Sequence, residues 1–165
     1  MGLLDGLFKG SKEPESIILF SPAKGTLVDI TEVSDETFAQ KILGDGIAVI
    51  PSDGKICSPC SGTVDNTFET GHAVSIVSDK GTEILIHAGI DTVKLKGEHF
   101  TVHKQTGDKV NAGDLLVEMD IEPIKEKGFD TTVVMVILNT DAYKDLEKKN
   151  GEAEVGGEVL RMAKK

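Results

Sequence analysis

Short apolar runs separated by turn-forming residues make up the chain from about residue 17 onward. Each run is rich in Val, Ile or Leu and is bounded by Gly, Asp, Asn or Pro; examples are IILFSP, GTLVDI, GIAVIP, AVSIV, EILIHAG, DLLVEM and TVVMVIL. Closely spaced short runs of this kind are typical of all-β sandwiches and barrels. The pattern predicts one mainly antiparallel β-sandwich or barrel domain over residues 17–165, preceded by a flexible segment over residues 1–16.

Two segments carry helix signals instead. VSDETFAQKIL (33–43) has Ser34 as a candidate N-terminal cap. NTDAYKDLEKK (139–149) has Asn139 or Thr140 as a candidate cap and lysines near its end, where they favour the helix dipole. We therefore expect only a few short helices in the domain, at these two places.

A short motif occurs twice. SPAKGT, beginning at Ser21, recurs as SPCSGT, beginning at Ser58, and each copy leads into an apolar run. Proline fixes φ and glycine permits positive φ, so each copy predicts a turn that starts a strand. GDKVNAGDLLVEM (107–119) adds paired Gly-Asp turns. The repeat is too short for a solenoid, and it predicts an internal duplication, with two similar halves in one sandwich.

The charge of the chain narrows the classes of partner. There are 28 acidic and 18 basic residues, a formal net charge of −10, and aromatic residues make up only 4%. Nucleic-acid binding needs a basic surface and is often supported by aromatic stacking, so we exclude nucleic acid as a partner. A basic protein partner fits this charge through electrostatic steering.

The N-terminal sequence bears on location. MGLLDGLFKG (1–10) places Leu3, Leu4, Leu7 and Phe8 on one helical face, which fits either a weak membrane contact through residues 1–10 or a frayed tail. No run approaches the roughly 20 apolar residues of a membrane span, and no export signal is recognisable. Two cysteines without such a signal favour a reducing compartment, so we expect a cytoplasmic, standalone protein.

The two cysteines form the motif Cys57-Ser-Pro-Cys60. A zinc site would need two further ligands at motif spacing, and a thioredoxin-like redox site would need a βαβ context. The sequence offers neither, so we interpret the pair as incidental residues at a strand–turn junction. We expect no cofactor.

Two histidines interrupt apolar runs on either side of the SDKG turn. If the hairpin loop holds two or four residues, His72 lies opposite His87, with Cβ atoms about 4.5–5.5 Å apart. A three-residue loop with a glycine bulge would shift the register by one and place the rings on opposite faces. A single strand histidine is commonly just a hydrogen-bonded residue, but an opposed pair favours metal binding, acid–base work or nucleophilic catalysis. His99 and His103 are predicted to be solvated and are given no role.

The hairpin also carries a family resemblance. HAVSIVSDKGTEILIHAGIDTVKLKGEHF (72–100) resembles the active-site hairpin of glucose-type enzyme IIA proteins of the bacterial sugar phosphotransferase system. VSDETFAQKILGDGIAVIP and GDKVNAGDLLVEMD resemble flanking parts of the same domain. The resemblance implies a β-sandwich phosphotransferase component that is phosphorylated on His87, with His72 stabilising the phosphoryl group. The donor would be the phosphohistidine of HPr, and the acceptor a cysteine in the IIB domain of a glucose-type permease.

The same resemblance implies roles for further residues. Thr70 would hydrogen-bond within the site, and the surface around the rings would be formed by Asp35, Phe38, Phe68, Asp91 and Val93. No intrinsic metal is implied, although His72 and His87 would be able to share a zinc ion with a carboxylate of a bound partner. Regulatory partners that distinguish the phosphorylated protein fit as well, because a phosphohistidine changes the surface charge. The sugar is not readable from the sequence.

Two alternatives remain open at this point. A lipoyl- or biotinyl-like carrier domain would present Lys80 on its hairpin and would use the Gly-Asp turns, but here the two segments occur in the reverse order. Glu118-Met119-Asp120 also stands where a biotin-type Met-Lys-Met would be expected. A LytM-like zinc peptidase would need a third ligand, and the chain has neither an H-x-H pair nor an export signal.

Overall fold

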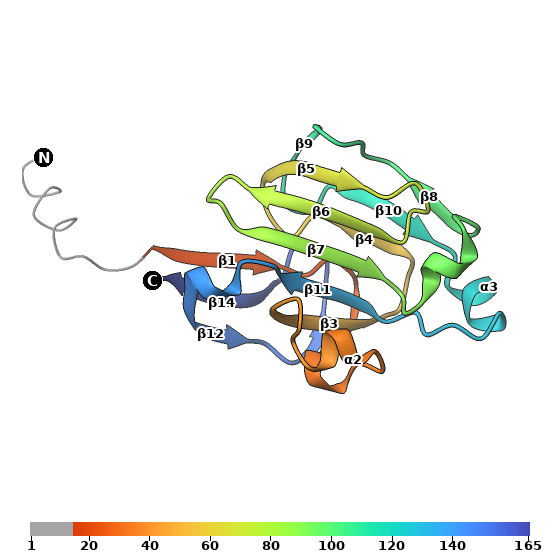
Figure 1. Ribbon diagram of the computed structural model, residues 1–165, viewed down its shortest axis with the longest axis horizontal. Coiled ribbons are helices and arrows are strands. Elements are labelled where there is room, and N and C mark those ends of the chain that lie inside the picture. The colour runs from red at the N-terminus through yellow and green to blue at the C-terminus, as the bar shows by residue number, and fades with distance from the viewer. Residues whose placement is uncertain (1–14) are drawn as a thin grey trace, which may run out of the picture.

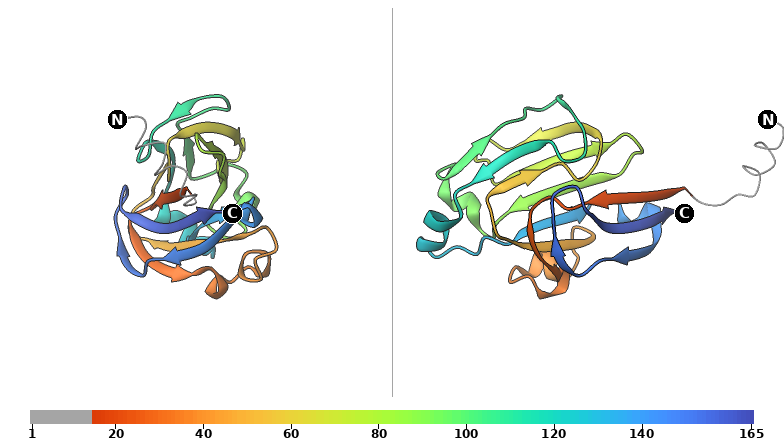
Figure 2. Two further views of the ribbon diagram at one scale, coloured as in Figure 1. Left: turned by 90° about the vertical axis from the view of Figure 1, so that its left-hand side faces the viewer. Right: turned by 180° about the vertical axis from the view of Figure 1, so that it is seen from behind.

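The computed structural model describes residues 15–165 as an antiparallel β-sandwich with internal duplication, as the sequence predicts. An eight-stranded sheet has the order β13-β2-β3-β11-β7-β6-β5-β9, and two three-stranded sheets have the orders β1-β14-β12 and β4-β10-β8 (Figure 1). The two small sheets cover one face of the large sheet (Figure 2). Residues 1–10, for which the sequence allows a weak membrane contact, lie outside the described residues.

The strands are short, as the spacing of the apolar runs indicates. Their bounds are β1 (Ser16–Phe20), β2 (Gly25–Asp29), β3 (Asp45–Pro51), β4 (Lys55–Cys57), β5 (Gly62–Thr67), β6 (Ala73–Ser78), β7 (Glu83–Ala88), β8 (Phe100–Val102), β9 (Lys109–Val110), β10 (Leu115–Met119), β11 (Val133–Ile137), β12 (Tyr143–Lys148), β13 (Gly151–Ala153) and β14 (Glu158–Lys164). The helices are η1 (Ile30–Glu32), α2 (Glu36–Ala39), η2 (Thr92–Leu95), α3 (Ile121–Glu126) and η3 (Thr140–Ala142).

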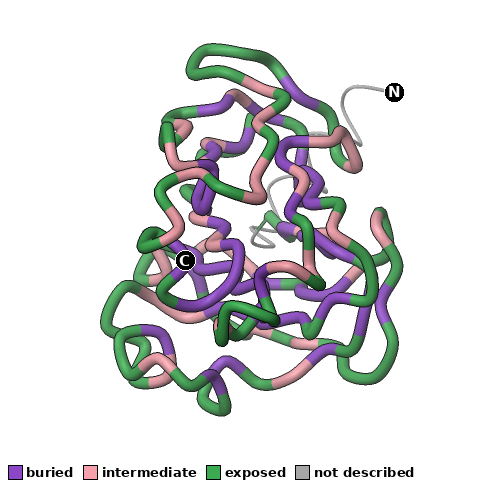
Figure 3. Tube along the Cα trace, turned by 90° about the vertical axis from the view of Figure 1, so that its right-hand side faces the viewer, coloured by how far each residue is buried: buried purple, intermediate pink, exposed green. Residues whose placement is uncertain are grey.

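Alternating side chains of the strands form two apolar clusters. The main core lies between the sheets and joins residues such as Leu19 and Leu160 to Ile76 and Ile86 of the large sheet. A smaller cluster lies on the other face of the large sheet, where Phe38 packs with residues such as Val134. Because both faces of the large sheet are covered at its centre, β11 is buried at every residue. Figure 3 shows buried stretches inside the sandwich and exposed residues in its loops. The smaller cluster anchors α2 beside the end of β7 and so helps to build the functional site.

The duplication is visible in hydrogen bonds. Ser21 Oγ donates to the carbonyl of Ala23 at 2.6 Å, and Ser58 Oγ donates to the carbonyl of Cys60 at 2.7 Å. The two copies also bond to each other, because Phe20 N–H donates to Pro59 and Cys57 N–H donates to Pro22. The pairings around them match: β1 with β14 and β2 with β13 in one half, β4 with β10 and β5 with β9 in the other.

A second repeated segment was not predicted from the sequence. GEAEVGGEVL (151–160) occupies the same place in its half as GDKVNAGDLL (107–116) does in the other, since each connects the matching pair of strands. Glutamate replaces aspartate in the second copy, which hides the match. Gly25 and Gly62 are equivalent in the motif, and a Cβ there would lie only 2.0 Å from the Ile50 oxygen and 2.3 Å from the Val77 oxygen.

Both helix predictions need correction. The segment 139–149 forms η3 and strand β12, because Tyr143 is buried and β12 pairs with β14. Tertiary burial here overrides the helix propensity of the charged residues. In the first segment the helix is only Glu36–Ala39, and its cap is Asp35, whose Oδ1 accepts from Thr37 N–H at 2.8 Å. Ser34, the predicted cap, instead donates to Asp130.

Helix α3 was not expected from the sequence, and it buries Ile124. None of the helices within residues 15–165 is long and apolar enough to cross a bilayer.

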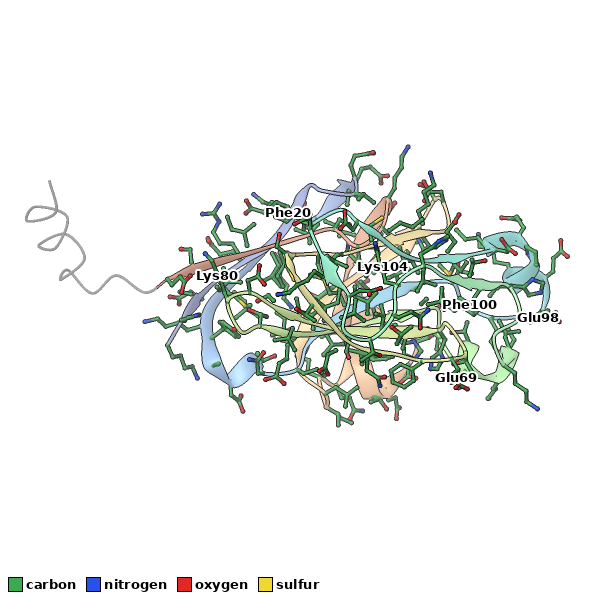
Figure 4. All side chains as sticks on the ribbon, turned by 90° about the horizontal axis from the view of Figure 1, so that it is seen from above. Phe20, Glu69, Lys80, Glu98, Phe100 and Lys104 are labelled. Carbon is green, nitrogen blue, oxygen red and sulfur yellow. The ribbon has the colours of Figure 1, made fainter. Side chains whose placement is uncertain are left out.

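The two ends of the described chain meet. Lys164 N–H donates to the carbonyl of Glu15, and the Glu15 carboxylate is 3.1 Å from Lys164 Nζ and 3.0 Å from Lys80 Nζ. Lys80 occupies the turn of the β6–β7 hairpin, so this corner lies at the turn end of that hairpin. Figure 4 shows Lys80 at this end of the molecule and Glu69 near the other end.

Candidate active site

The β6–β7 hairpin has the register of the three-residue loop. Ala73 lies opposite His87, and Val77 lies opposite Glu83. The prediction that His72 lies directly opposite His87 is therefore wrong by one residue. The cause is the turn, in which Ser78 N–H donates to Thr82 and Gly81 has φ +92°, the bulge geometry that inserts one extra residue.

The two imidazole rings meet despite this register. Their centroids are 5.1 Å apart with planes at 71°. His72 precedes the first residue of β6, and the preceding Gly71 has φ +68°, so the strict alternation of strand faces does not apply to it. Its carbonyl still accepts from Ala88 N–H at 2.6 Å. The rings thus share one face, and the expectation that a one-residue shift would separate them does not hold.

The turn after β7 holds the ring of His87. Nδ1 is 2.6 Å from the carbonyl oxygen of Gly89. A carbonyl can only accept, so Nδ1 carries the proton and Nε2 keeps its lone pair. Gly89 has φ +82°, and a Cβ there would lie 2.5 Å from Thr92 Cγ2, so the turn requires glycine. Thr92 also fixes the turn, because its hydroxyl donates to the Ala88 carbonyl at 2.6 Å.

Thr70 lies beside the other ring. Its hydroxyl is hydrogen-bonded to Nδ1 of His72. With the hydroxyl donating, the proton of the neutral His72 ring sits on Nε2. The two rings then differ in the nitrogen that each has available: a lone pair on His87 and an N–H on His72.

A phenylalanine packs edge-on against each histidine. The ring of Phe38 lies 5.1 Å from that of His87, and the ring of Phe68 lies 5.3 Å from that of His72. Phe38 is buried, whereas Phe68 is 38% exposed and Val93 is 48% exposed. These contacts orient the imidazoles, and the exposed part of Phe68 leaves an apolar surface beside His72.

Asp35 and Asp91 occupy helix starts near His87. Asp35 caps α2, and Asp91 precedes η2 in the left-handed region with φ +60°. Burial lowers the pKa of His87, while the bond to Gly89 and the two carboxylates act in the opposite direction. Burial, with a smaller contribution from His87, lowers the pKa of His72 to about 4. Both rings are therefore neutral at pH 7.

The structure brings together all the residues around the rings that the sequence singled out, except that Val93 is placed only as an exposed residue of η2. Sequence reasoning missed Asp130, whose side chain binds Ser34 and Thr132. No local pattern marks it, because Ser34 is distant in sequence and GFDTT reads as an ordinary turn.

The remaining candidate groups lie elsewhere. Cys57 and Cys60 are free and buried, and burial raises the pKa of both thiols, that of Cys60 to about 12. His103 is exposed and pairs with Glu118 at 2.8 Å, whereas His99 is half-buried beside Glu98. The described residues include no group of three His, Cys, Asp or Glu side chains placed to hold a metal ion.

Comparison with known proteins identifies the class. Residues 17–143 match the family described as "phosphoenolpyruvate-dependent sugar phosphotransferase system, EIIA 1". The chain belongs to this family, and it is thus a component of a sugar phosphotransferase system with a phosphotransferase role. Membership in this family excludes the lipoyl- or biotinyl-like carrier domain and the LytM-like peptidase as alternatives.

Several similar proteins carry names that are more specific than the family description. The chain is 45% identical over 160 residues to the PTS system glucose-specific EIIA component of Halalkalibacterium halodurans, covering 94% of this chain and 92% of that one. It is 42% identical to the component of the same name from Haemophilus influenzae, over the full length of both. The solved structure of glucose permease IIA from Mycoplasma capricolum superposes with a TM-score of 0.82 at 34% identity, covering 89% of this chain and 96% of that chain.

Some relatives are much longer than this chain. The glucose-specific EIICBA component of Streptococcus pneumoniae is 49% identical over 145 residues, which cover 87% of this chain and only 20% of that protein.

Proposed function

We propose that the protein is a glucose-type phosphocarrier, which accepts a phosphoryl group from phospho-HPr on His87 and passes it to a cysteine of a permease IIB domain. One observation carries this proposal: Nδ1 of His87 is bound to Gly89 at 2.6 Å, so the lone pair is on Nε2, and this ring stands 5.1 Å from that of His72. The names of the similar proteins support glucose as the sugar.

Two exchanges of bonds make up the reaction. In the first, the lone pair of His87 Nε2 attacks the phosphorus of the donor phosphohistidine. A new P–N bond forms while the old P–N bond breaks, and its electron pair returns to the donor imidazole. In the second, a cysteine thiolate attacks the same phosphorus, a P–S bond forms, and the electron pair returns to Nε2. A neutral imidazole is a competent nucleophile for this near pH 7.

His72 and Thr70 stabilise the transferring group. Phosphoryl transfer depends on in-line placement and on neutralising charge at the phosphoryl oxygens. With Thr70 donating to Nδ1, Nε2–H of His72 is the donor directed at those oxygens, and it strengthens as negative charge builds. The lowered pKa of His72 keeps the ring neutral before the group arrives.

The surface around the rings suits a basic partner with an apolar centre. Phe68 and Val93 offer exposed apolar area, and Asp35 and Asp91 add negative charge beside it. Such a surface favours a donor with complementary positive charge, which HPr would supply. A matching segment occurs within the EIICBA component of Streptococcus pneumoniae, and this supports a IIB domain as acceptor.

Phosphoryl labelling tests the proposal. The protein, incubated with phosphoenolpyruvate, enzyme I and HPr, should gain one phosphate that is labile in acid and stable in base. His87→Ala should gain none. His103→Ala, an exposed histidine paired with Glu118, should label like the wild type. Label that maps to another residue, or that persists in His87→Ala, would overturn the assignment.

A further inference from the structure

We propose that Asp130 is a positioning residue that fixes the protonated nitrogen of His87 through the peptide between Gly89 and Ile90. This inference rests on the proposed function of His87, and it adds a residue outside the ring pair and its docking surface. Asp130 stands in the loop between α3 and β11, far in sequence from the hairpin.

The peptide unit of Gly89 and Ile90 is held at both ends. Its carbonyl accepts the Nδ1–H of His87 at 2.6 Å, and its N–H donates to the Asp130 carbonyl at 2.8 Å. Gly89 N–H also donates to the Thr132 carbonyl at 3.0 Å. Hydrogen bonds in such a chain polarise one another. The loop of Asp130 therefore sets both the orientation and the acceptor strength of the carbonyl that His87 meets.

The Asp130 side chain in turn fixes its own loop. Oδ1 accepts from Thr132 N–H at 2.9 Å and from Thr132 Oγ1 at 2.7 Å. This is an Asx turn, in which the side chain holds the backbone two residues onward. Without it, the Asp130 and Thr132 carbonyls, which receive the two N–H groups of the active-site turn, lose their local anchor.

The second carboxylate oxygen reaches the opposite wall of the site. Oδ2 accepts from Ser34 Oγ at 3.2 Å. Ser34 directly precedes Asp35, the cap of α2, and α2 carries Phe38 against the His87 ring. Asp130 thus contacts both supports of His87: its backbone carbonyl accepts from the turn that holds Nδ1–H, and its carboxylate accepts from Ser34, the residue before the cap of α2.

A merely structural role would not change which nitrogen of His87 is protonated, so the tautomer is the decisive measurement. Asp130 is exposed, and Asp130→Ala should fold. Nitrogen chemical shifts of ¹⁵N-labelled histidine in the unphosphorylated protein report the tautomer directly. We expect the wild type to show only Nδ1–H for His87, and Asp130→Ala to show a mixture of both tautomers. Its labelling by phospho-HPr should slow about tenfold, as for other residues that orient a reactive ligand.

Two further variants separate the contributions. Asp130→Asn keeps an oxygen for Thr132 and should restore the single tautomer and most of the rate. Ser34→Ala removes only the link to α2, so it should leave the tautomer unchanged and slow labelling about twofold. A single Nδ1–H tautomer in Asp130→Ala would overturn the proposal, and so would a tautomer mixture in Ser34→Ala as large as that in Asp130→Ala. Failure of the wild type to accept phosphate would contradict the proposed function alone, since the tautomer is read without phosphate.

Discussion

His72 and His87 bring their rings together although their positions are one residue out of register in the hairpin. His87 lies within β7 opposite Ala73, and His72 lies just before β6, after the turn at Gly71. One ring is therefore held by a regular ladder and the other by an irregular turn with Thr70 as its hydrogen-bond partner. The two supports are joined by one backbone bond, because the His72 carbonyl accepts from Ala88 N–H, next to His87.

The first prediction concerns the His72 side chain. His72→Gln keeps an N–H donor but cannot take up a proton. We expect it to accept phosphate from HPr within several-fold of the wild-type rate and to pass it on about 10²-fold more slowly, within the usual range for loss of one acid–base group. Rapid-quench measurement of each half-reaction separates the two steps. Onward transfer at the wild-type rate would remove His72 from the mechanism.

The second prediction concerns stability and pH. The pKa of His72 falls from 6.5 to about 4 on folding, so between these values the unfolded chain binds more protons. The free energy of unfolding must then fall as pH is lowered through this window. We expect His72, which is 7% exposed, to contribute about 1–2 kcal/mol of loss between pH 7 and pH 5.

Urea unfolding at pH 7 and pH 5 measures this loss. His72→Gln should lose less stability than the wild type between the two values. An equal loss in His72→Gln would contradict the pKa shift.

The third prediction contrasts the two phenylalanines. Phe38 is 5% exposed and belongs to the smaller apolar cluster, so Phe38→Ala should cost about 3–5 kcal/mol of stability. Phe68 is 38% exposed, and Phe68→Ala should cost less than about 1 kcal/mol. If Phe68 contributes to docking, its loss should nevertheless weaken the binding of HPr, measured by titration calorimetry. Binding that is unchanged in Phe68→Ala would exclude it from the contact surface.

The fourth prediction concerns charge at the docking surface. Asp35→Asn keeps the helix cap, since asparagine caps about as well as aspartate, but removes a negative charge. We expect the KM for phospho-HPr to rise several-fold at low salt and the difference to disappear at high salt. Asp53→Asn is the matched control, because Asp53 caps a turn by accepting from Lys55 N–H at 3.0 Å without lying at the site. An equal rise in KM in both variants would show that the effect comes from the net charge of the protein and not from a contact at Asp35.

The fifth prediction concerns the thiols. Cys57 and Cys60 are 5% and 7% exposed, and burial raises the pKa of both. The thiolate is the reactive form, so a disulfide reagent at pH 8 should modify neither cysteine in the folded protein and both after unfolding in urea. Fast modification of the folded protein would show that the CSPC motif is accessible and would reopen its role.

Much of the fold was predictable from the sequence. Strand-length apolar runs and the repeated SPxxGT motif define the sandwich and its duplication, because turn chemistry and alternation are local properties. The failure at 139–149 has a tertiary cause. Tyr143 is drawn into the core, where its hydroxyl lies 2.8 Å from Thr82 Oγ1, and that contact joins residues far apart in the chain.

The site was predictable in its residues but not in its geometry. The histidines and their neighbours follow from the hairpin and the family resemblance. The hairpin register was open, since it depends on whether Gly81 forms a bulge, and the position of His72 depends on the conformation of Gly71. The position of Asp130 at the site could not be predicted, because it depends on bonds to Ser34 and to the turn after β7, which are distant in sequence.

The contact of Glu15 with Lys164 and Lys80 has a consequence for how the domain is mounted. Both described ends leave the sandwich at the tip of the β6–β7 hairpin, whereas the imidazoles stand at its far end, six strand residues or about 20 Å away. A tether joined to either end would therefore hold the domain from the hairpin tip, with the two histidines facing away from the tether. A neighbouring domain could then be attached at either end without covering the face that carries the two histidines.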